Sequence, residues 1–335
     1  MKIHILSQLI DGPWGGGNQF QKALKNQLIK NNIFSENIND CDTIIINSHH
    51  WNDKLWQLFK LKRANPKLVI IHRIDGPISI ARGSDKQLVV DKAIINFNNS
   101  FVDGTVFQSD WSREKWIPIG MQNNNPQIVI KNAPDNNIFH SYNKSNKKNK
   151  KLRIIATSWS PNWNKGFEIY KFLDEKLDFT KYDFTFIGNS PIKFKNIKQI
   201  KPMYSTELAD QLRRHDLYIT ASKNDSCSNS LIEAIHCGLV PIALDSGGNS
   251  EIINLRNLLF QSKEDVIKVI ENVNTDIEKK YKLLNLETID VVCDKYINFI
   301  NSIQLRKLKD GVYPKYYSFF KTLIHINKVK RINNA

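Results

Sequence analysis

A run of glycines near the start of the chain could hold an anion. Residues 11–20 read DGPWGGGNQF, and we expect a helix over about 18–30 directly after them. Glycines let backbone amides approach an anion at a helix start, where the dipole and the unpaired N–H groups favour negative charge. A tight strand-to-helix turn would use the same residues. Because the glycines at 15–17 are consecutive and Phe20 stands where a later glycine is needed, this is not the dinucleotide-binding GxGxxG pattern. A dehydrogenase is therefore disfavoured.

A histidine ends a later apolar run, KLVIIH at 67–72. A side chain at the carboxyl end of a parallel strand points toward the ligand crevice, so His72 is a candidate for chemistry. A lone histidine is equally compatible with a satisfied polar position in the core. The sequence has no DxD at a strand end and no histidine pair at helical spacing, so we expect no metal and no cofactor.

Short β-rich runs alternate with amphipathic segments, which predicts parallel strands covered by helices. The runs in the first half are 2–6, 43–47, 67–72, 105–108 and 127–131. After a polar, basic segment at 141–150, strands are expected at 152–158, 183–188, near 200, 216–222 and 239–244. This alternation predicts an α/β protein with two Rossmann-like, doubly wound domains, over 1–145 and 151–305. Residues 306–335 mix aromatics with lysines, and we expect them to pack back on the first domain; contact with a membrane surface is the alternative.

Composition excludes some classes of protein and leaves others open. The 335 residues are 41% hydrophobic, enough for two cores, and the four cysteines show no zinc-like spacing. We find neither a secretion signal nor an apolar run of roughly 20 residues, so we expect a cytoplasmic protein, with peripheral attachment at the inner face of the membrane as the alternative. The net charge of +15 predicts an anionic partner, and a compositional bias of the source, with many Lys, Asn and Ile residues, is the equal alternative. Nucleic acid is one such partner, but the chain has no recognisable nucleic-acid motif.

Three strings in the second half carry a family resemblance: TSWSPNWNKGFEIY, DFTFIGN and ITASKNDSCSNSLIEAIHCGLVPIALDSGGNSEII. In this order they resemble glycosyltransferase family 4, over about 152–253 and more thinly in the first domain. The resemblance implies the GT-B architecture, in which two Rossmann-like domains face each other across a cleft, and transfer of sugar from a nucleotide donor with retention. It also implies a role in polysaccharide biosynthesis, with a glycan or lipid-linked acceptor.

The resemblance implies roles for two acidic residues separated by seven others. Glu233 would accept hydrogen bonds from the ribose hydroxyls, and Asp225 would contact the transferred sugar. The helix start near Asn229 offers free amides to phosphate. The family usually has a glutamate at the position of Asp225. The side chain that would contact the sugar is therefore one methylene shorter in this chain. A glutamate that stabilises its own helix dipole is the alternative reading of Glu233.

Lys165 and Gly166 match the family's KG pair, in which the lysine neutralises the diphosphate leaving group. Where the family often has an arginine five residues earlier, this chain has Ser160, and Arg73 and Arg82 are candidate substitutes. The same resemblance places further residues around the donor: Gly16, Gly17, Asn164, Gly188, Gly247, Gly248 and Asn249. For the last three, a plain glycine turn after a strand is the alternative.

In the first domain, the resemblance implies that His72 forms a hydrogen bond with the donor sugar or with the departing oxygen. We expect Asn18, Arg73 and Asp75 to contact the acceptor. Together these roles predict a retaining glycosyltransferase that works without metal. An epimerase or hydrolase of nucleotide sugars with the same fold is the enzymatic alternative. A nucleic-acid-binding protein is the alternative outside enzymes.

Overall fold

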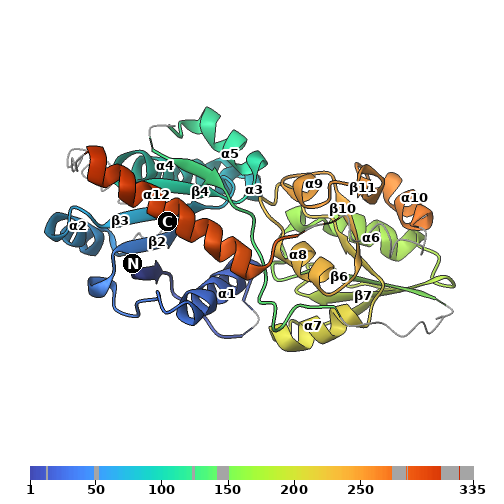
Figure 1. The fold of residues 1–335 in the computed structure, drawn as a ribbon. Coiled ribbons are helices and arrows are strands. Elements are labelled where there is room, and N and C mark those ends of the chain that lie inside the picture. The colour runs from blue at the N-terminus through green and yellow to red at the C-terminus, as the bar shows by residue number, and fades with distance from the viewer. Residues whose placement is uncertain are drawn as a thin grey trace. The chain divides into compact units, whose positions relative to one another are not determined.

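The computed structural model describes residues 1–12, 14–48, 53–122, 125–141, 151–273, 284, 286–310 and 324. Contacts divide the chain into two compact α/β units (Figure 1). The first unit contains Met1–Leu9, Leu24–Lys131 and the chain from Asp290 onward, and the second contains Ile10–Ala23 and Asn132–Ile289.

The first unit is built on a parallel sheet in the order β1-β2-β3-β4-β5. Its strands are β1 (Ile3–Leu6), β2 (Thr43–Asn47), β3 (Val69–Ile74), β4 (Gly104–Phe107) and β5 (Gln127–Val129). A parallel bridge joins Ile3 to Phe34 on the other side of β1, so the strand order reverses at β1. That reversal is the mark of a doubly wound sheet.

Helices of the first unit bury their apolar faces on this sheet. They are α1 (Gly16–Lys30), whose first turns group with the second unit, α2 (Leu55–Ala64), α3 (Ile78–Arg82), α4 (Leu88–Phe101), α5 (Asp110–Trp116) and α12 (Ile289–Asp310). Short 3-10 turns lie at η1 (Ile38–Asp40), η2 (Asp85–Gln87) and η3 (Ile117–Ile119). One core cluster joins Ile44 and Ile46 of β2 to Leu58 of α2 and Phe97 of α4.

Helix α12 returns the chain to the first unit, earlier than the boundary expected at residue 305. A side chain on Gly104 of β4 would collide with Ile303 and meet Phe299, so the helix lies directly on that strand. Lys307 donates to the backbone of Leu68 at 2.8 Å and to Asp103 at 3.0 Å. Among the described residues after 264, separate helices lie at Asp265–Asn272 and Ile289–Asp310, and the later one completes the first unit. Of the expected C-terminal packing segment, residues 311–323 and 325–335 lie outside the described residues, as does most of the expected linker.

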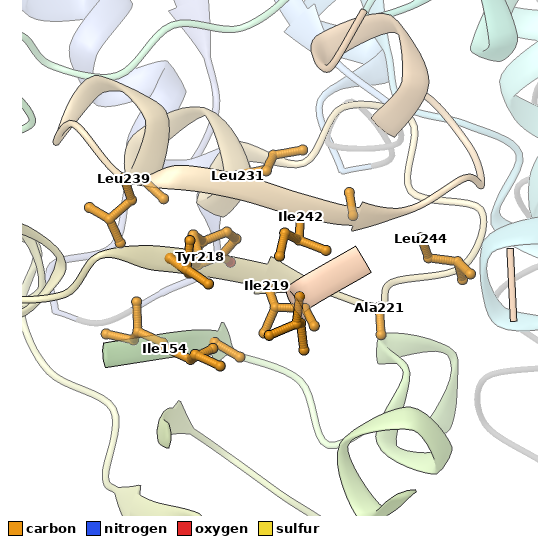
Figure 2. Close-up of a cluster of buried hydrophobic side chains, with 14 of the residues drawn as sticks. Ile154, Tyr218, Ile219, Ala221, Leu231, Leu239, Ile242 and Leu244 are labelled. Atoms are coloured by element: carbon orange, nitrogen blue, oxygen red, sulfur yellow. The ribbon is translucent and has the colours of Figure 1, made fainter. Parts of the chain in front are cut away.

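The second unit contains a six-stranded parallel sheet in the order β11-β10-β9-β6-β7-β8. Its strands are β6 (Leu152–Ser158), β7 (Tyr182–Gly188), β8 (Lys198–Ile200), β9 (Leu217–Thr220), β10 (Val240–Leu244) and β11 (Leu259–Phe260). Its helices are α6 (Phe167–Lys176), α7 (Ser205–Arg213), α8 (Asn229–His236), α9 (Asn249–Ile252) and α10 (Asp265–Asn272), with 3-10 turns η4 (Trp163–Lys165) and η5 (Arg256–Leu258). Apolar side chains of β6, β9, β10 and α8 meet in its core (Figure 2).

Two parallel sheets with helical crossovers confirm the predicted fold class of two Rossmann-like domains. The buried runs explain this success: all five residues of β2 and all four of β9 are buried, as expected for strands covered on both faces.

Candidate functional site

The second sheet has a topological switch point between β6 and β9. The chain passes from β6 to β7 and β8 on one side and then crosses to β9 on the other, where Ile154 pairs with Leu217. Loops that leave such a pair of strands diverge at their carboxyl ends and open a crevice in which α/β proteins bind ligands. The loops after β6 and β9 therefore define the candidate site.

A cation and a carboxylate meet at this point. Lys165 ends the 3-10 turn η4 after β6, and its Nζ lies 2.9 Å from Oδ2 of Asp225 and 3.3 Å from Oγ of Ser222. The side chains remain partly accessible, 37% for Lys165 and 19% for Asp225. Burial opposes ionisation of Asp225, but the charge and hydrogen bond of Lys165 outweigh it and hold the pKa below its usual value. The two groups form an ion pair that a ligand can still reach.

The glycine turn after β10 supports the Asp225 loop. Gly247 has a φ of +66°, and a side chain there would collide with the backbone of Asp225. The Gly248 amide donates to the Asp225 carbonyl at 2.8 Å. Asn249 is fully buried, and its Nδ2 donates to the carbonyls of Ser222 (3.3 Å) and Leu244 (3.1 Å). This turn therefore fixes the loop that carries the carboxylate.

Helix α8 follows the same loop and places Glu233 inside the unit. Its side chain is 7% exposed, and this burial raises the pKa of the carboxyl to about 8. At the start of the helix, Oδ1 of Asn229 accepts from Nδ2 of Asn132 at 3.0 Å. A side chain on Gly16, which groups with the second unit, would collide with Asn229. The glycine-rich run and the α8 helix start are therefore neighbours.

The other predicted donor residues serve close backbone packing. A side chain on Gly166 would collide with Ala221, and one on Gly188 with the carbonyl of Ser158. The Asn164 carbonyl accepts from the Lys223 amide at 2.7 Å, which ties the loop after β6 to the loop after β9. At Gly17, by contrast, an added Cβ would meet no atom within 4 Å.

In the first unit, the structure corrects the expectation for His72. Strand β3 continues to Ile74, so His72 lies inside the strand and is fully buried. Its Nε2 lies 2.6 Å from the Ser48 carbonyl, and Nδ2 of Asn98 lies 3.1 Å from its Nδ1. Both ring nitrogens are engaged within the core, which matches the structural alternative.

The carboxyl end of β3 instead presents Asp75, whose side chain is 46% exposed. Its Oδ2 accepts from Oγ of Ser48 at 2.8 Å, while Oδ1 accepts from Gln108 and lies 3.5 Å from Nη1 of Arg73. Trp116 donates from Nε1 to the Asp75 carbonyl at 2.7 Å. Residues that follow β2, β3 and β4 thus converge on one accessible carboxylate.

Two basic residues and one amide complete the set of predicted site residues. Arg73 is 1% exposed and bonds Asn47 and Asp75, so its guanidinium is engaged inside the first unit. Arg82 is an exposed residue at the end of α3. The amide of Asn18 accepts from the Ile10 N–H at 3.0 Å and donates to the Ile10 carbonyl at 2.8 Å, which braces the loop.

Sequence reasoning missed three polar residues that orient these carboxylates: Ser222, Ser48 and Gln108. Each directly follows, by one or two positions, a strand of the described sheets. A polar residue just after a buried run was the available signal.

Across the described ranges, we find no group of three or more His, Cys, Asp or Glu residues that could hold a metal ion. Nor does any helix in this part of the chain have the length and apolar content needed to span a membrane.

Sequence comparisons give short matches. No family model matches the chain. It is 24% identical over 195 residues to uncharacterized protein 356 of Sulfolobus islandicus rod-shaped virus 1, a match that covers 52% of this chain and 54% of the viral protein. It is 32% identical over 119 residues to protein CapJ of Staphylococcus aureus, over 30% of each chain. The chain thus spans about half the length of the first relative and less than a third of the second.

Comparisons of structure cover most of the chain. HepE of Anabaena, solved with UDP and glucose, gives a TM-score of 0.62 at 12% identity over 92% of this chain and 98% of that one. Sucrose-phosphate synthase of Thermosynechococcus elongatus gives 0.54 at 13% identity, over 87% and 76%. An E. coli trehalose-6-phosphate structure with UDP-2-fluoro glucose gives 0.56 at 10% identity, over 86% and 78%. With two parallel sheets and these neighbours, the chain has the GT-B fold, built from two Rossmann-like domains.

Proposed function

We propose that this chain is a retaining glycosyltransferase that moves a sugar from a nucleoside diphosphate sugar to a hydroxyl acceptor. The observation that carries the proposal is the accessible Lys165–Asp225 pair at the switch point of the second sheet. The family resemblance of the strings around these residues supports it. So do solved structures with this fold, one of which holds UDP and glucose and another UDP-2-fluoro glucose.

The donor half of the proposal follows from charge and hydrogen-bonding capacity. The ammonium of Lys165 and the free amides at the start of α8 would bind the diphosphate. One turn further along α8, Glu233 would accept hydrogen bonds from the two ribose hydroxyls. Asp225, fixed by the glycine turn, would accept from hydroxyls of the transferred sugar. A diphosphate would share Lys165 with Asp225 in this arrangement.

The chemical step we propose is attack from the face that the nucleotide leaves. The bond between the anomeric carbon and the diphosphate oxygen breaks, and the acceptor oxygen bonds to the same face of that carbon. The acceptor proton passes to the departing phosphate oxygen, so atoms and charge balance without a covalent enzyme intermediate. Lys165 stabilises the negative charge that develops on the leaving group, the contribution that often dominates catalysis. We propose that this cation replaces a divalent metal.

For the acceptor, we propose Asp75 as the contact in the first unit. Its carboxylate is held by Ser48 and Gln108 yet half-exposed, so it retains lone pairs for an acceptor hydroxyl. Such a carboxylate suits a glycan or the sugar of a lipid-linked acceptor, as used in polysaccharide biosynthesis. The net charge of +15 is compatible with phosphate on either substrate and with reaction at the inner face of a membrane.

Nucleotide binding and sugar transfer test the proposal in sequence. We would measure the shift in Tm with UDP, GDP, ADP and the glucose conjugate of each, then incubate the best donor with candidate acceptors and determine the anomeric configuration of the product by NMR. We expect one nucleotide series to raise Tm, and a product with the configuration of the donor. Donor consumption that is equally fast without acceptor would indicate an epimerase or hydrolase. A flat Tm panel or an inverted product would refute the proposal.

A further inference from the structure

Exposed aromatic rings gather at the carboxyl edge of the second sheet. Trp14, Trp159 and Tyr204 are 43%, 40% and 60% exposed and come from three separate segments of the second unit. We propose that Trp14 and Trp159 form a stacking surface for the nucleobase of the donor, with Tyr204 at its rim. This inference rests on the proposed function, because it assigns the part of a nucleotide donor that Lys165 and Glu233 leave unbound.

The two indoles form one continuous surface. Their ring centroids lie 5.2 Å apart with an interplanar angle of 41°, and Gly15 brings the backbone of the glycine-rich run against the Trp159 ring. A Cβ atom added at Gly12 would lie 3.9 Å from the ring of Trp14 and 4.0 Å from the ring of Tyr204, so both rings lie beside this glycine. This arrangement leaves a ring-sized apolar surface accessible between segments that are far apart in sequence.

Hydrogen bonds fix the loops that carry the indoles. Nδ2 of Asn189, which follows β7, donates to the Trp159 carbonyl at 2.7 Å. Nε2 of Gln19 lies 3.2 Å from the carbonyl of Gly12 and 3.4 Å from that of Trp14. A ligand ring would therefore find a surface that is already ordered, which reduces the entropy lost on binding.

Strand order decides which ring of the donor lies there. Along the carboxyl edge from β9 through β6 to β7 and β8, the ion pair of Lys165 and Asp225 comes first, between the loops after β9 and β6. Trp159 follows β6 and is tied to the loop after β7, and Tyr204 follows β8. A diphosphate at the ion pair, with its sugar at Asp225 and its ribose at Glu233, would extend its base toward the indole side. A flat base stacks on exposed indole with a gain that does not depend on base identity.

Binding measurements on matched tryptophan variants test this inference. Trp159→Ala and Trp14→Ala are compared with wild type and with Trp56→Ala, an indole that is 55% exposed in the first unit. UDP, GDP, ADP, the best nucleotide's glucose conjugate and inorganic pyrophosphate are titrated by calorimetry. Base stacking is worth about 1–3 kcal/mol per aromatic side chain, so Trp159→Ala and Trp14→Ala should each bind nucleotide roughly 5- to 150-fold more weakly. Trp159→Phe should retain most of the affinity, and Trp56→Ala all of it.

The ligands separate the possible causes. The expected result is an equal loss for the nucleotide and its sugar conjugate, with unchanged pyrophosphate binding. A loss confined to the sugar conjugate would mean that the indoles contact the sugar, and an equal loss for pyrophosphate would mean that the loop was merely displaced; either result overturns the inference. Unchanged nucleotide affinity in both alanine variants overturns it while leaving the glycosyltransferase proposal intact. Wild-type protein that binds no nucleotide would overturn both.

Discussion

The two units place charged residues at the carboxyl ends of their sheets in different ways. In the first unit, His72 and Arg73 are buried and bonded to neighbouring protein groups, and the half-exposed carboxylate of Asp75 is held by three side chains. In the second unit, Lys165 and Asp225 pair but remain accessible, and Glu233 is buried with its pKa raised to about 8. Hydrogen bonds within the protein stabilise the first arrangement. In the second, the charged groups are only partly paired, so a ligand can gain free energy by interacting with them.

Under the proposed function, this difference would let two similar sheets divide one reaction. The diphosphate would bind at the accessible cation of the second unit, Lys165. The acceptor hydroxyl would bind at the fixed hydrogen-bond acceptor of the first unit, Asp75. The same fold would then supply a donor side and an acceptor side through the placement of a few polar residues after the strands.

The largest effect is expected from Lys165→Ala. Removal of the cation leaves the charge on the departing diphosphate without its main partner, so transfer should fall about 100- to 1,000-fold in kcat. Lys223→Ala is the matched control, because this lysine lies in the same unit and pairs with Glu168 on the surface at 2.6 Å. Steady-state transfer rates would check both variants. An equal loss in the control, or normal turnover by Lys165→Ala, would contradict the role of the ion pair.

His72→Ala tests whether the first unit uses this histidine for packing. Loss of a buried ring and of its bonds to Ser48 and Asn98 should lower the free energy of unfolding by about 2–4 kcal/mol. Urea denaturation measures this change, and nucleotide affinity of the folded variant should equal that of wild type. A variant with normal stability and no transfer would restore the catalytic role that the sequence suggested.

Glu233→Gln tests the charge state of the second unit through pH. The folded pKa of about 8 lies above the unfolded value of 4.5, so Glu233 stabilises the fold fully below pH 4.5 and this contribution is lost as pH rises toward 8. The glutamine variant lacks this dependence. Its stability advantage over wild type should therefore grow by about 2 kcal/mol between pH 6 and pH 8, as measured by urea denaturation. A constant difference would show that burial does not perturb this carboxyl.

Asp75→Asn separates the acceptor side from the donor side. The amide keeps the size of the side chain but loses the charge that accepts from an acceptor hydroxyl, so transfer should fall about 10- to 100-fold. Nucleotide affinity and slow donor hydrolysis should not change. Exposed Asp85 provides the control, Asp85→Asn, with wild-type transfer. If Asp75→Asn weakened nucleotide binding as much as transfer, the division of roles would be wrong.

The smallest effect is expected from metal removal. If Lys165 supplies the charge that a divalent ion supplies elsewhere, EDTA should change the transfer rate by less than about twofold. The same assay with added Mg²⁺ or Mn²⁺ provides the comparison. Abolition of transfer by EDTA and recovery with a divalent ion would assign the leaving-group charge to a metal.

Strands of the second unit could be predicted because buried runs such as LYIT and VPIAL match parallel strands in length and composition. The family resemblance also assigned Lys165 and Asp225 to one donor, and the structure pairs the two side chains. The indole surface was not predicted, because the contact between Trp14 and Trp159 joins segments about 145 residues apart that no local pattern connects.

His72 shows why the first unit was harder to predict. The apolar run ends at residue 72, but the strand continues through Arg73, which is buried because Asn47 and Asp75 bond its guanidinium. Tertiary contacts of this kind override the usual exposure of arginine. The sequence likewise did not indicate which sheet α12 would cover, because its contact with Gly104 joins residues that are far apart in the chain.

The position of α12 also has a consequence for synthesis of the protein. Lys307 bonds Leu68 and Asp103, which lie 239 and 204 residues earlier in the chain, and Phe299 and Ile303 cover Gly104. The first unit therefore emerges from the ribosome with the part of its sheet around Gly104 still uncovered, and it completes its core only after the second unit has been made. Any fragment that stops before residue 289 should expose that apolar face and aggregate.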